Sequence, residues 1–127
     1  MDDELLAAVD AREAASAALR KTDPLGALRL ALADPPYGRA TAAAVREAST
    51  DVVCRALLLV REAEIDASVG ALSLEECDVL MKYIYAGLGQ RARERQYAPL
   101  LRWHAHVLKR AGQGSIVRVI SEVQRQL

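Results

Sequence analysis

The apolar residues of this chain recur with the period of an α-helix, and this periodicity is the feature that most restricts its fold. Between positions 74 and 88 they stand three and four residues apart, as they do on one face of a helix. No stretch alternates apolar and polar residues for long enough to predict a strand. Alanine and leucine are abundant, and both are strong helix formers. The sequence therefore predicts an all-α fold.

Capping residues, prolines and glycines divide this pattern into separate helices. Ser73 and Glu76 have the spacing of a capping box, in which each side chain binds the backbone N–H of the other residue. Asp23 followed by Pro24 is typical of a helix start, and a later pair of prolines ends that helix. Together these signals predict about six or seven helices that form an α-α superhelix. Their expected ranges are about 2–21, 24–34, 41–63, 65–72, 74–88, 97–111 and 115–127.

The length and composition of the chain predict one helical domain over residues 1–127. The chain has 127 residues, 52% of them hydrophobic, which suffices for one core. Lys plus Arg equals Asp plus Glu at 17 each, so no overall basic charge attracts nucleic acid or membrane. Between positions 91 and 127 there are eight basic and two acidic residues. This local excess indicates either solvated helix faces or a surface for an acidic partner.

The cysteines and the N-terminus indicate the compartment. Cys54 and Cys77 both lie in apolar helical patterns, which favours buried free thiols in a reducing compartment over a disulfide. The N-terminus is acidic where a signal peptide would be basic. No stretch is long and apolar enough to span a bilayer. The sequence therefore predicts a soluble cytoplasmic protein.

Residues 111–120, AGQGSIVRVI, contain two glycines that invite comparison with phosphate-binding loops. No lysine precedes Ser115 and no strand precedes the glycines, so neither GxxxxGK[ST] nor GxGxxG fits. We instead predict that Gly112 ends one helix in the left-handed conformation and that Ser115 begins the last helix. No phosphate is expected at this loop. In the last helix we expect a buried Ile116, a buried Ile120 and an exposed Arg118.

No arrangement of residues points to catalysis, a cofactor or a metal. His104 and His106 stand two residues apart, so they do not share a helix face, and a closed zinc site needs further ligands. A hydrogen-bonded His104 and a solvated His106 are expected instead. The chain has no nucleophile elbow and no catalytic-cysteine signature. We therefore predict no enzyme activity, no catalytic residue, no cofactor-binding residue and no metal ligand.

Two aromatic residues and one arginine are candidates for contact with a partner protein. Tyr83 lies outside the main apolar stripe of its helix, and Trp103 flanks the stripe of its own helix. Aromatic residues at the edge of a core are enriched at protein interfaces. Packing within the core is the alternative for both rings. Arg118, which points outward in the predicted last helix, is the third candidate.

Three stretches in register resemble one known family. They are DVLMKYIY at 78–85, LLRWH at 100–104 and GSIVRV at 114–119. Together they look like the C-terminal half of the smallest subunit, subunit five, of the actin-related protein two/three complex. GALRLALADPP at 26–36 and IDASVGAL at 65–72 are more loosely similar to earlier parts of the same family. The resemblance therefore extends over most of the chain.

This resemblance implies a non-catalytic, all-α structural subunit of a complex that nucleates branched actin filaments in the cytoplasmic actin cytoskeleton. It implies contacts with the WD-repeat subunit and one scaffold subunit of the complex, and with actin only indirectly. In the family an extended acidic N-terminal arm tethers the subunit to an actin-related subunit. Here only Asp2, Asp3 and Glu4 form an acidic cluster before the helical pattern begins. We therefore expect the arm to be largely absent.

Two other functions compete with this one. The wide apolar stripes also suit a free-standing helical-repeat adaptor that binds a peptide or helix in a groove. The basic C-terminal third suits a nucleic-acid binder, whose binding would weaken steeply with salt. The zero net charge and the few aromatic residues argue against that third function.

Overall fold

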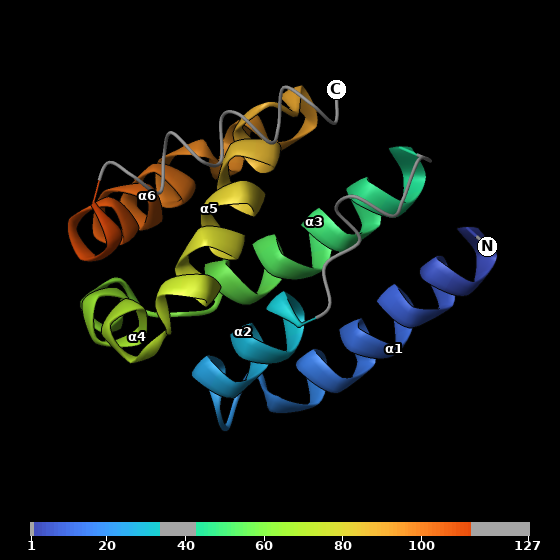
Figure 1. Ribbon diagram of the computed structural model, residues 1–127, viewed down its shortest axis with the longest axis horizontal. Coiled ribbons are helices and arrows are strands. Elements are labelled where there is room, and N and C mark those ends of the chain that lie inside the picture. The colour runs from blue at the N-terminus through green and yellow to red at the C-terminus, as the bar shows by residue number, and fades with distance from the viewer. Residues whose placement is uncertain (1, 34–42, 113–127) are drawn as a thin grey trace. The chain divides into compact units, whose positions relative to one another are not determined.

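The computed structural model describes residues 2–33 and 43–112, and in these ranges it consists of helices without a strand (Figure 1). The all-α prediction is confirmed. The chain divides into two compact units, residues 1–59 and 60–127, and each is described by itself. The single domain predicted over residues 1–127 stays a prediction.

The elements are α1 (Asp2–Leu19), α2 (Pro24–Leu32), α3 (Ala43–Leu58), η1 (Glu62–Glu64), α4 (Ile65–Ala71), α5 (Leu74–Leu88), η2 (Arg91–Gln96) and α6 (Tyr97–Ala111), where η denotes a 3₁₀ helix.

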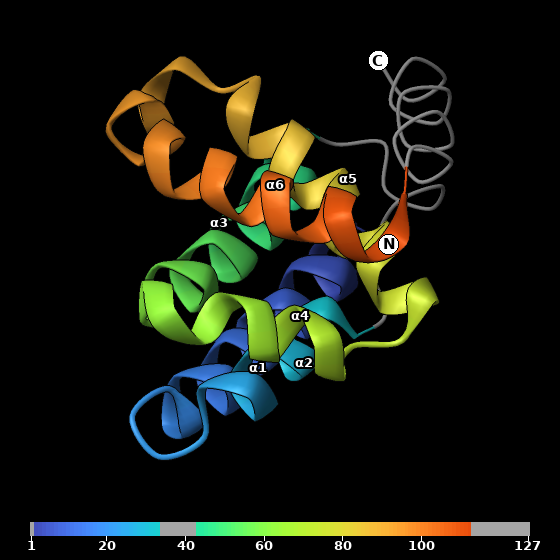
Figure 2. The ribbon, with the colours of Figure 1, turned by 90° about the vertical axis from the view of Figure 1, so that its left-hand side faces the viewer.

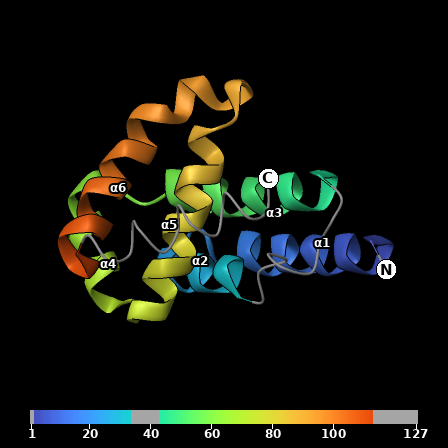
Figure 3. The same cartoon turned by 45° about the horizontal axis from the view of Figure 1, so that its top comes forward.

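The first unit is built from α1, α2 and α3, each of which contacts the other two. Helix α2 runs back along α1 in the opposite direction, and α3 packs on both (Figures 1 and 3). Leu28 and Val45 are fully enclosed, and Val9 of α1 is almost so. Because α1 is rich in alanine, the larger side chains of α2 and α3 supply most of this core.

The start of α2 follows the predicted pattern. The Asp23 carboxylate accepts a hydrogen bond of 3.0 Å from the Gly26 backbone N–H, and Pro24 occupies the first turn. Gly26 fits closely under this cap, since a Cβ built there would lie 2.2 Å from Oδ2 of Asp23. Helix α2 ends at Leu32, ahead of the pair of prolines, which lies outside the described residues.

Polar contacts tie the helices of the first unit together. The buried Ser16 hydroxyl of α1 donates a hydrogen bond of 2.9 Å to the carbonyl of Ala27 in α2. The Glu13 carboxylate accepts from Arg20 at 2.6 Å and also lies 3.4 Å from the guanidinium of Arg55 in α3. The Glu13 ion pairs are partly exposed and so add little free energy. The hydroxyl of Ser16 is enclosed, and its hydrogen bond fixes the position of α1 along α2.

The predicted helix over 41–63 is wrong at its C-terminal end. Helix α3 stops at Leu58, and the 3₁₀ helix η1 begins at Glu62. Leu59, expected on the apolar face, is 54% exposed, whereas Val60 is buried. No glycine or proline marks this break, so local sequence signals predict a continuous helix across it.

The second unit contains α4, α5, η2 and α6. Helix α6 returns along α5 after the short η2 connection (Figure 1), and α4 packs against α6 (Figure 2). The polar RARER connection predicted after α5 thus forms a 3₁₀ helix. The core of this unit draws most of its fully buried side chains from α5 and α6. They are Cys77, Leu80, Met81, Tyr83, Ile84, Leu100, Trp103 and Val107.

The capping box predicted at Ser73 and Glu76 is confirmed. The Glu76 backbone N–H donates to Oγ of Ser73 at 3.0 Å, and the Ser73 backbone N–H donates to Oε1 of Glu76 at 2.9 Å. At its other end α5 runs through Leu88, as predicted, and is capped by Gly89. Gly87 is a buried residue within the helix.

Replacing Ser73 by alanine should lower the free energy of unfolding by about 0.5–2 kcal/mol, because the Glu76 N–H loses its acceptor. Urea denaturation of the full chain, followed by circular dichroism, measures this loss. Glu75→Gln is the matched control, since Glu75 lies in the same first turn but outside the box. A Ser73→Ala variant as stable as the wild-type chain would contradict the stabilising role of the Ser73 hydroxyl.

Both cysteines are buried and neither is in a disulfide bond, as predicted. Burial raises the pKa of the Cys77 thiol above its ordinary value. The positive charge of Arg110 opposes this shift in pKa, while the carboxylates of Asp78 and Glu76 reinforce it. Cys77 is therefore a packed, protonated thiol and not a reactive one.

Candidate functional site

Gly112, the first of the two glycines that were compared with a phosphate-binding loop, caps the C-terminal end of α6. The Gly112 backbone N–H donates a hydrogen bond of 2.8 Å to the carbonyl of Leu108, which closes the last turn of α6. Gly112 has a φ of 78°, a value that favours glycine, and a ψ of 179°. The prediction that Gly112 ends the helix at positive φ is confirmed. Ser115 and the predicted positions of Ile116, Arg118 and Ile120 lie outside the described residues.

The two aromatic residues predicted as partner contacts are enclosed in the structure. The exposed fraction is 0% for Tyr83 and 1% for Trp103. Trp103 lies between Leu100 and Val107 on the buried side of α6, so it is central to the apolar stripe and does not flank it. The predicted contacts gain no support from this burial, and core packing describes both rings. Their role toward a partner stays a prediction, as does that of Arg118, which lies outside the described residues.

The placement of Tyr83 outside the apolar stripe is wrong for a physical reason. Leu80 and Ile84 are buried together with Tyr83, so the buried face of α5 is wider than a stripe at three- and four-residue spacing. Tyr85, two positions along the helix, reaches His104 of α6, so Tyr83 lies on nearly the opposite side of α5 and that side is buried as well.

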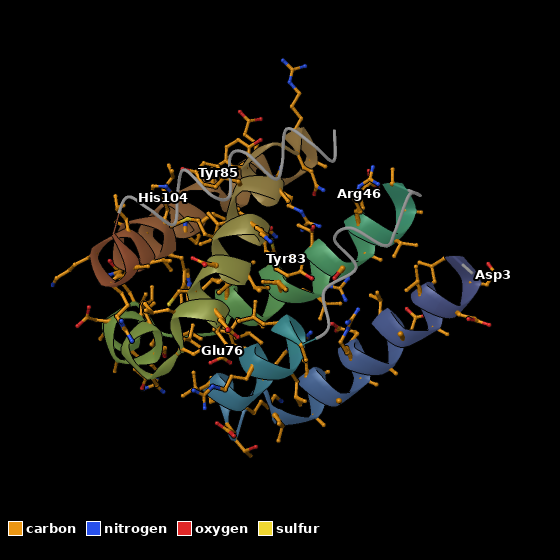
Figure 4. All side chains as sticks on the ribbon, viewed as in Figure 1. Asp3, Arg46, Glu76, Tyr83, Tyr85 and His104 are labelled. Atoms are coloured by element: carbon orange, nitrogen blue, oxygen red, sulfur yellow. The ribbon has the colours of Figure 1, made fainter. Side chains whose placement is uncertain are left out.

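The two histidines face different helices. Tyr85 of α5 and His104 of α6 form a hydrogen bond of 2.9 Å between Oη and Nε2, with their rings nearly perpendicular at 88° (Figure 4). His106 instead directs Nδ1 toward Oδ1 of Asp66 in α4, at 3.4 Å. The expected hydrogen-bonded His104 is confirmed. His106 is half-buried, and its ring faces Asp66 as well as solvent.

Helices α4 and α6 enclose an open pocket of about 320 Å³ on the surface of the second unit. Three of its side chains come from α6 at the spacing of one helix face, and the rest come from α4. We call it the α4–α6 pocket. Its lining residues are Asp66, Val69, Gly70, His106, Lys109 and Arg110.

Sequence reasoning missed this pocket, because its two walls are distant in the chain. Asp66 and His106 are separated by 40 positions, and no local pattern relates them. The one available signal is the spacing of His106, Lys109 and Arg110, which places three nitrogen-bearing side chains on one face of α6. The structure adds the facing wall, where Gly70 contributes no side chain.

Arg110 is anchored at the rim of the α4–α6 pocket. Its Nη2 atom donates to the carbonyl of Leu72, just beyond α4, at 3.4 Å. Arg102, about two turns before Arg110 along α6, lies 3.9 Å from the carboxylate of Glu62 in η1. The surface between α4 and α6 is thus lined by basic groups of α6 and by carboxylates of the preceding segment.

The described parts of the chain contain neither a cluster of metal ligands nor a helix that could cross a membrane. Within residues 2–33 and 43–112, no three His, Cys, Asp or Glu side chains gather closely enough to bind a metal ion. Over the same residues, no helix combines the length and the apolar character needed to cross a bilayer.

Comparison with known proteins identifies one family. Residues 2–126 match the family described as ARP2/3 complex 16 kDa subunit (p16-Arc). The chain is 38% identical to actin-related protein 2/3 complex subunit 5 of Dictyostelium discoideum over 105 residues, which are 83% of this chain and 73% of that protein. It is 36% identical to the probable subunit 5 of Caenorhabditis elegans over 99 residues, covering 78% of this chain and 67% of that protein. The subunit 5-like protein of Homo sapiens is 38% identical over 103 residues, or 81% of this chain and 66% of that protein.

Proposed function

This chain belongs to the p16-Arc family, the 16 kDa subunits of the ARP2/3 complex, and from that premise we propose that it is a non-catalytic structural subunit of this complex. The main support for this proposal is the match to the family over residues 2–126, which is nearly the whole chain. The relatives are named as subunit 5 of the actin-related protein 2/3 complex. In this role the chain supports the nucleation of branched actin filaments by its place in the assembly and not by chemistry of its own.

The partners of such a subunit are the other subunits of the complex. We propose the WD-repeat subunit and a scaffold subunit as direct partners, an actin-related subunit as a further contact, and the cytoplasmic actin cytoskeleton as the location. Surface leucines supply apolar area that a partner would cover, since association of subunits is driven largely by burial of such area. Among residues 2–33 and 43–112, the leucines that are at least 36% exposed are Leu30, Leu58, Leu59, Leu74 and Leu101.

The predicted contact residues fit this proposal in two different ways. Tyr83 and Trp103 would serve the assembly indirectly, because their enclosed rings stabilise the packing of α5 and of α6. Arg118 would contact a partner directly, as an outward-facing cation of the basic C-terminal third. Family membership favours this structural subunit over both the free-standing adaptor and the nucleic-acid binder.

Affinity purification from the organism's own cells tests the proposal. The tagged full chain should recover actin-related proteins and a WD-repeat protein in stoichiometric amounts, as determined by quantitative mass spectrometry. A tag carried by an unrelated helical protein is the control. A monodisperse chain bound to one unrelated ligand would contradict the proposal and favour the adaptor. Recovery of nucleic acid that is lost steeply with salt would favour the nucleic-acid binder.

A further inference from the structure

We propose that the α4–α6 pocket binds a carboxylate side chain of another subunit of the complex. This inference rests on the proposed function, because it assigns one contact within the same assembly. Its physical basis is a surface recess lined by cationic and imidazole donors from α6, with an open floor at Gly70 of α4.

The charge of the lining favours an anion. Lys109 and Arg110 carry two positive charges, and Asp66 carries one negative charge. Asp66 is already directed toward His106, with 3.4 Å between Oδ1 and Nδ1. Among the described residues Lys109 has no ion-pair partner, and its side chain is exposed at the rim. A carboxylate entering the pocket would therefore supply the counter-charge that Lys109 lacks.

The guanidinium of Arg110 is also restrained in a position from which it can bind such a ligand. Arg110 donates one N–H to the Leu72 carbonyl, which restrains its guanidinium at the pocket and leaves further N–H groups for an incoming acceptor. Hydrogen bonds between ionised groups are about twice as strong as those between neutral ones. A single carboxylate between Lys109 and Arg110 would accept from both.

The recess has room because α4 carries a glycine there. A Cβ built on Gly70 meets no atom within 4 Å, so the floor of the pocket is open and not filled by a neighbouring side chain. Gly70 is exposed and lies in the last turn of α4, one residue before the helix ends at Ala71.

A carboxylate fits the recess better than a phosphate group does. A phosphate monoester carries a charge of about −1.5 to −2 at neutral pH. Lys109, Arg110 and Asp66 give the lining a net charge of +1, which one carboxylate neutralises, whereas a phosphate monoester would leave a net negative charge in the recess. Glutamate and aspartate of a partner subunit therefore match both the sign and the size of the charge.

Two variants of the full chain test this pocket within the reconstituted complex. Lys109→Glu reverses the charge that is free to pair, and Gly70→Leu fills the recess without changing charge. Arg91→Glu on η2 and Ala67→Leu on α4 are the matched controls, since both residues are exposed and lie outside the pocket. Circular dichroism and urea denaturation first confirm that all four variants fold.

We expect Lys109→Glu and Gly70→Leu each to raise the Kd for the remaining subunits by about tenfold or more, and the controls to change it little. The effect of Lys109→Glu should shrink as salt is raised. If the wild-type chain assembles and Lys109→Glu binds as tightly as Arg91→Glu, the pocket inference is overturned and the proposed function stands. If the wild-type chain itself does not assemble, the proposed function fails.

Zero-length carbodiimide crosslinking of the assembled complex identifies the occupant directly. This chemistry joins a lysine amine to a carboxylate that touches it, with loss of water. We expect an amide between Lys109 and an Asp or Glu of another subunit, detected by mass spectrometry of the digested complex. A Lys109 crosslink to Asp66 alone would show that the pocket is closed within this chain and would overturn the inference.

Discussion

Replacing Trp103 by alanine is expected to lower the free energy of unfolding of the full chain by about 3–5 kcal/mol. The ring is 1% exposed and lies between Leu100 and Val107, so its removal leaves a cavity that α5 and α6 cannot refill. Urea denaturation followed by tyrosine fluorescence and circular dichroism measures the loss. Such a loss is a large part of the stability of a domain of this size.

Leu101→Ala is the matched control for this prediction, because Leu101 lies on the same helix and is 54% exposed. It should change the free energy of unfolding by only a few tenths of a kcal/mol. The pair of variants also separates core packing from partner contact. A stable Trp103→Ala chain that no longer assembles would restore Trp103 as a direct contact and would contradict its enclosure here.

Leu28→Ala should have a similarly large effect on the first unit, a loss of about 2–5 kcal/mol. Leu28 is fully enclosed in α2, which packs against both α1 and α3. Leu30→Ala on the same helix is the control, since that side chain is 36% exposed and its truncation should cost much less. Chemical denaturation measures the free energy of unfolding of both variants. Equal losses would mean that α2 is not anchored through its Leu28 face.

Features set by a few neighbouring residues could be predicted from the sequence. The capping box at Ser73, the start of α2 at Asp23 and the end of α6 at Gly112 all follow from local hydrogen bonds and backbone preferences. Each needs only groups within four positions of one another, so a single sequence contains the whole cause. The all-α class is predictable for the same reason, since helical periodicity is also a local property.

Features set by tertiary packing could not be predicted in this way. The end of α3 at Leu58 has no proline or glycine signal, and the exposure of Leu59 depends on how the chain turns there. The enclosure of Tyr83 depends on how many elements pack around α5, which periodicity does not state. The α4–α6 pocket needs Asp66 and His106 to meet from distant positions, and only the folded chain brings them together.

Helix α1 contacts both other helices of the first unit but buries few of its own side chains. Between residues 3 and 19 only Val9 and Ser16 are buried, and the alanines of the helix face solvent. Detaching α1 would expose few large side chains of its own, but it would uncover the faces of α2 and α3 on which it packs and break the buried hydrogen bond from Ser16 to Ala27. The docking of α1 therefore depends mainly on apolar surface that α2 and α3 supply, and any substitution on those faces should loosen α1 as well.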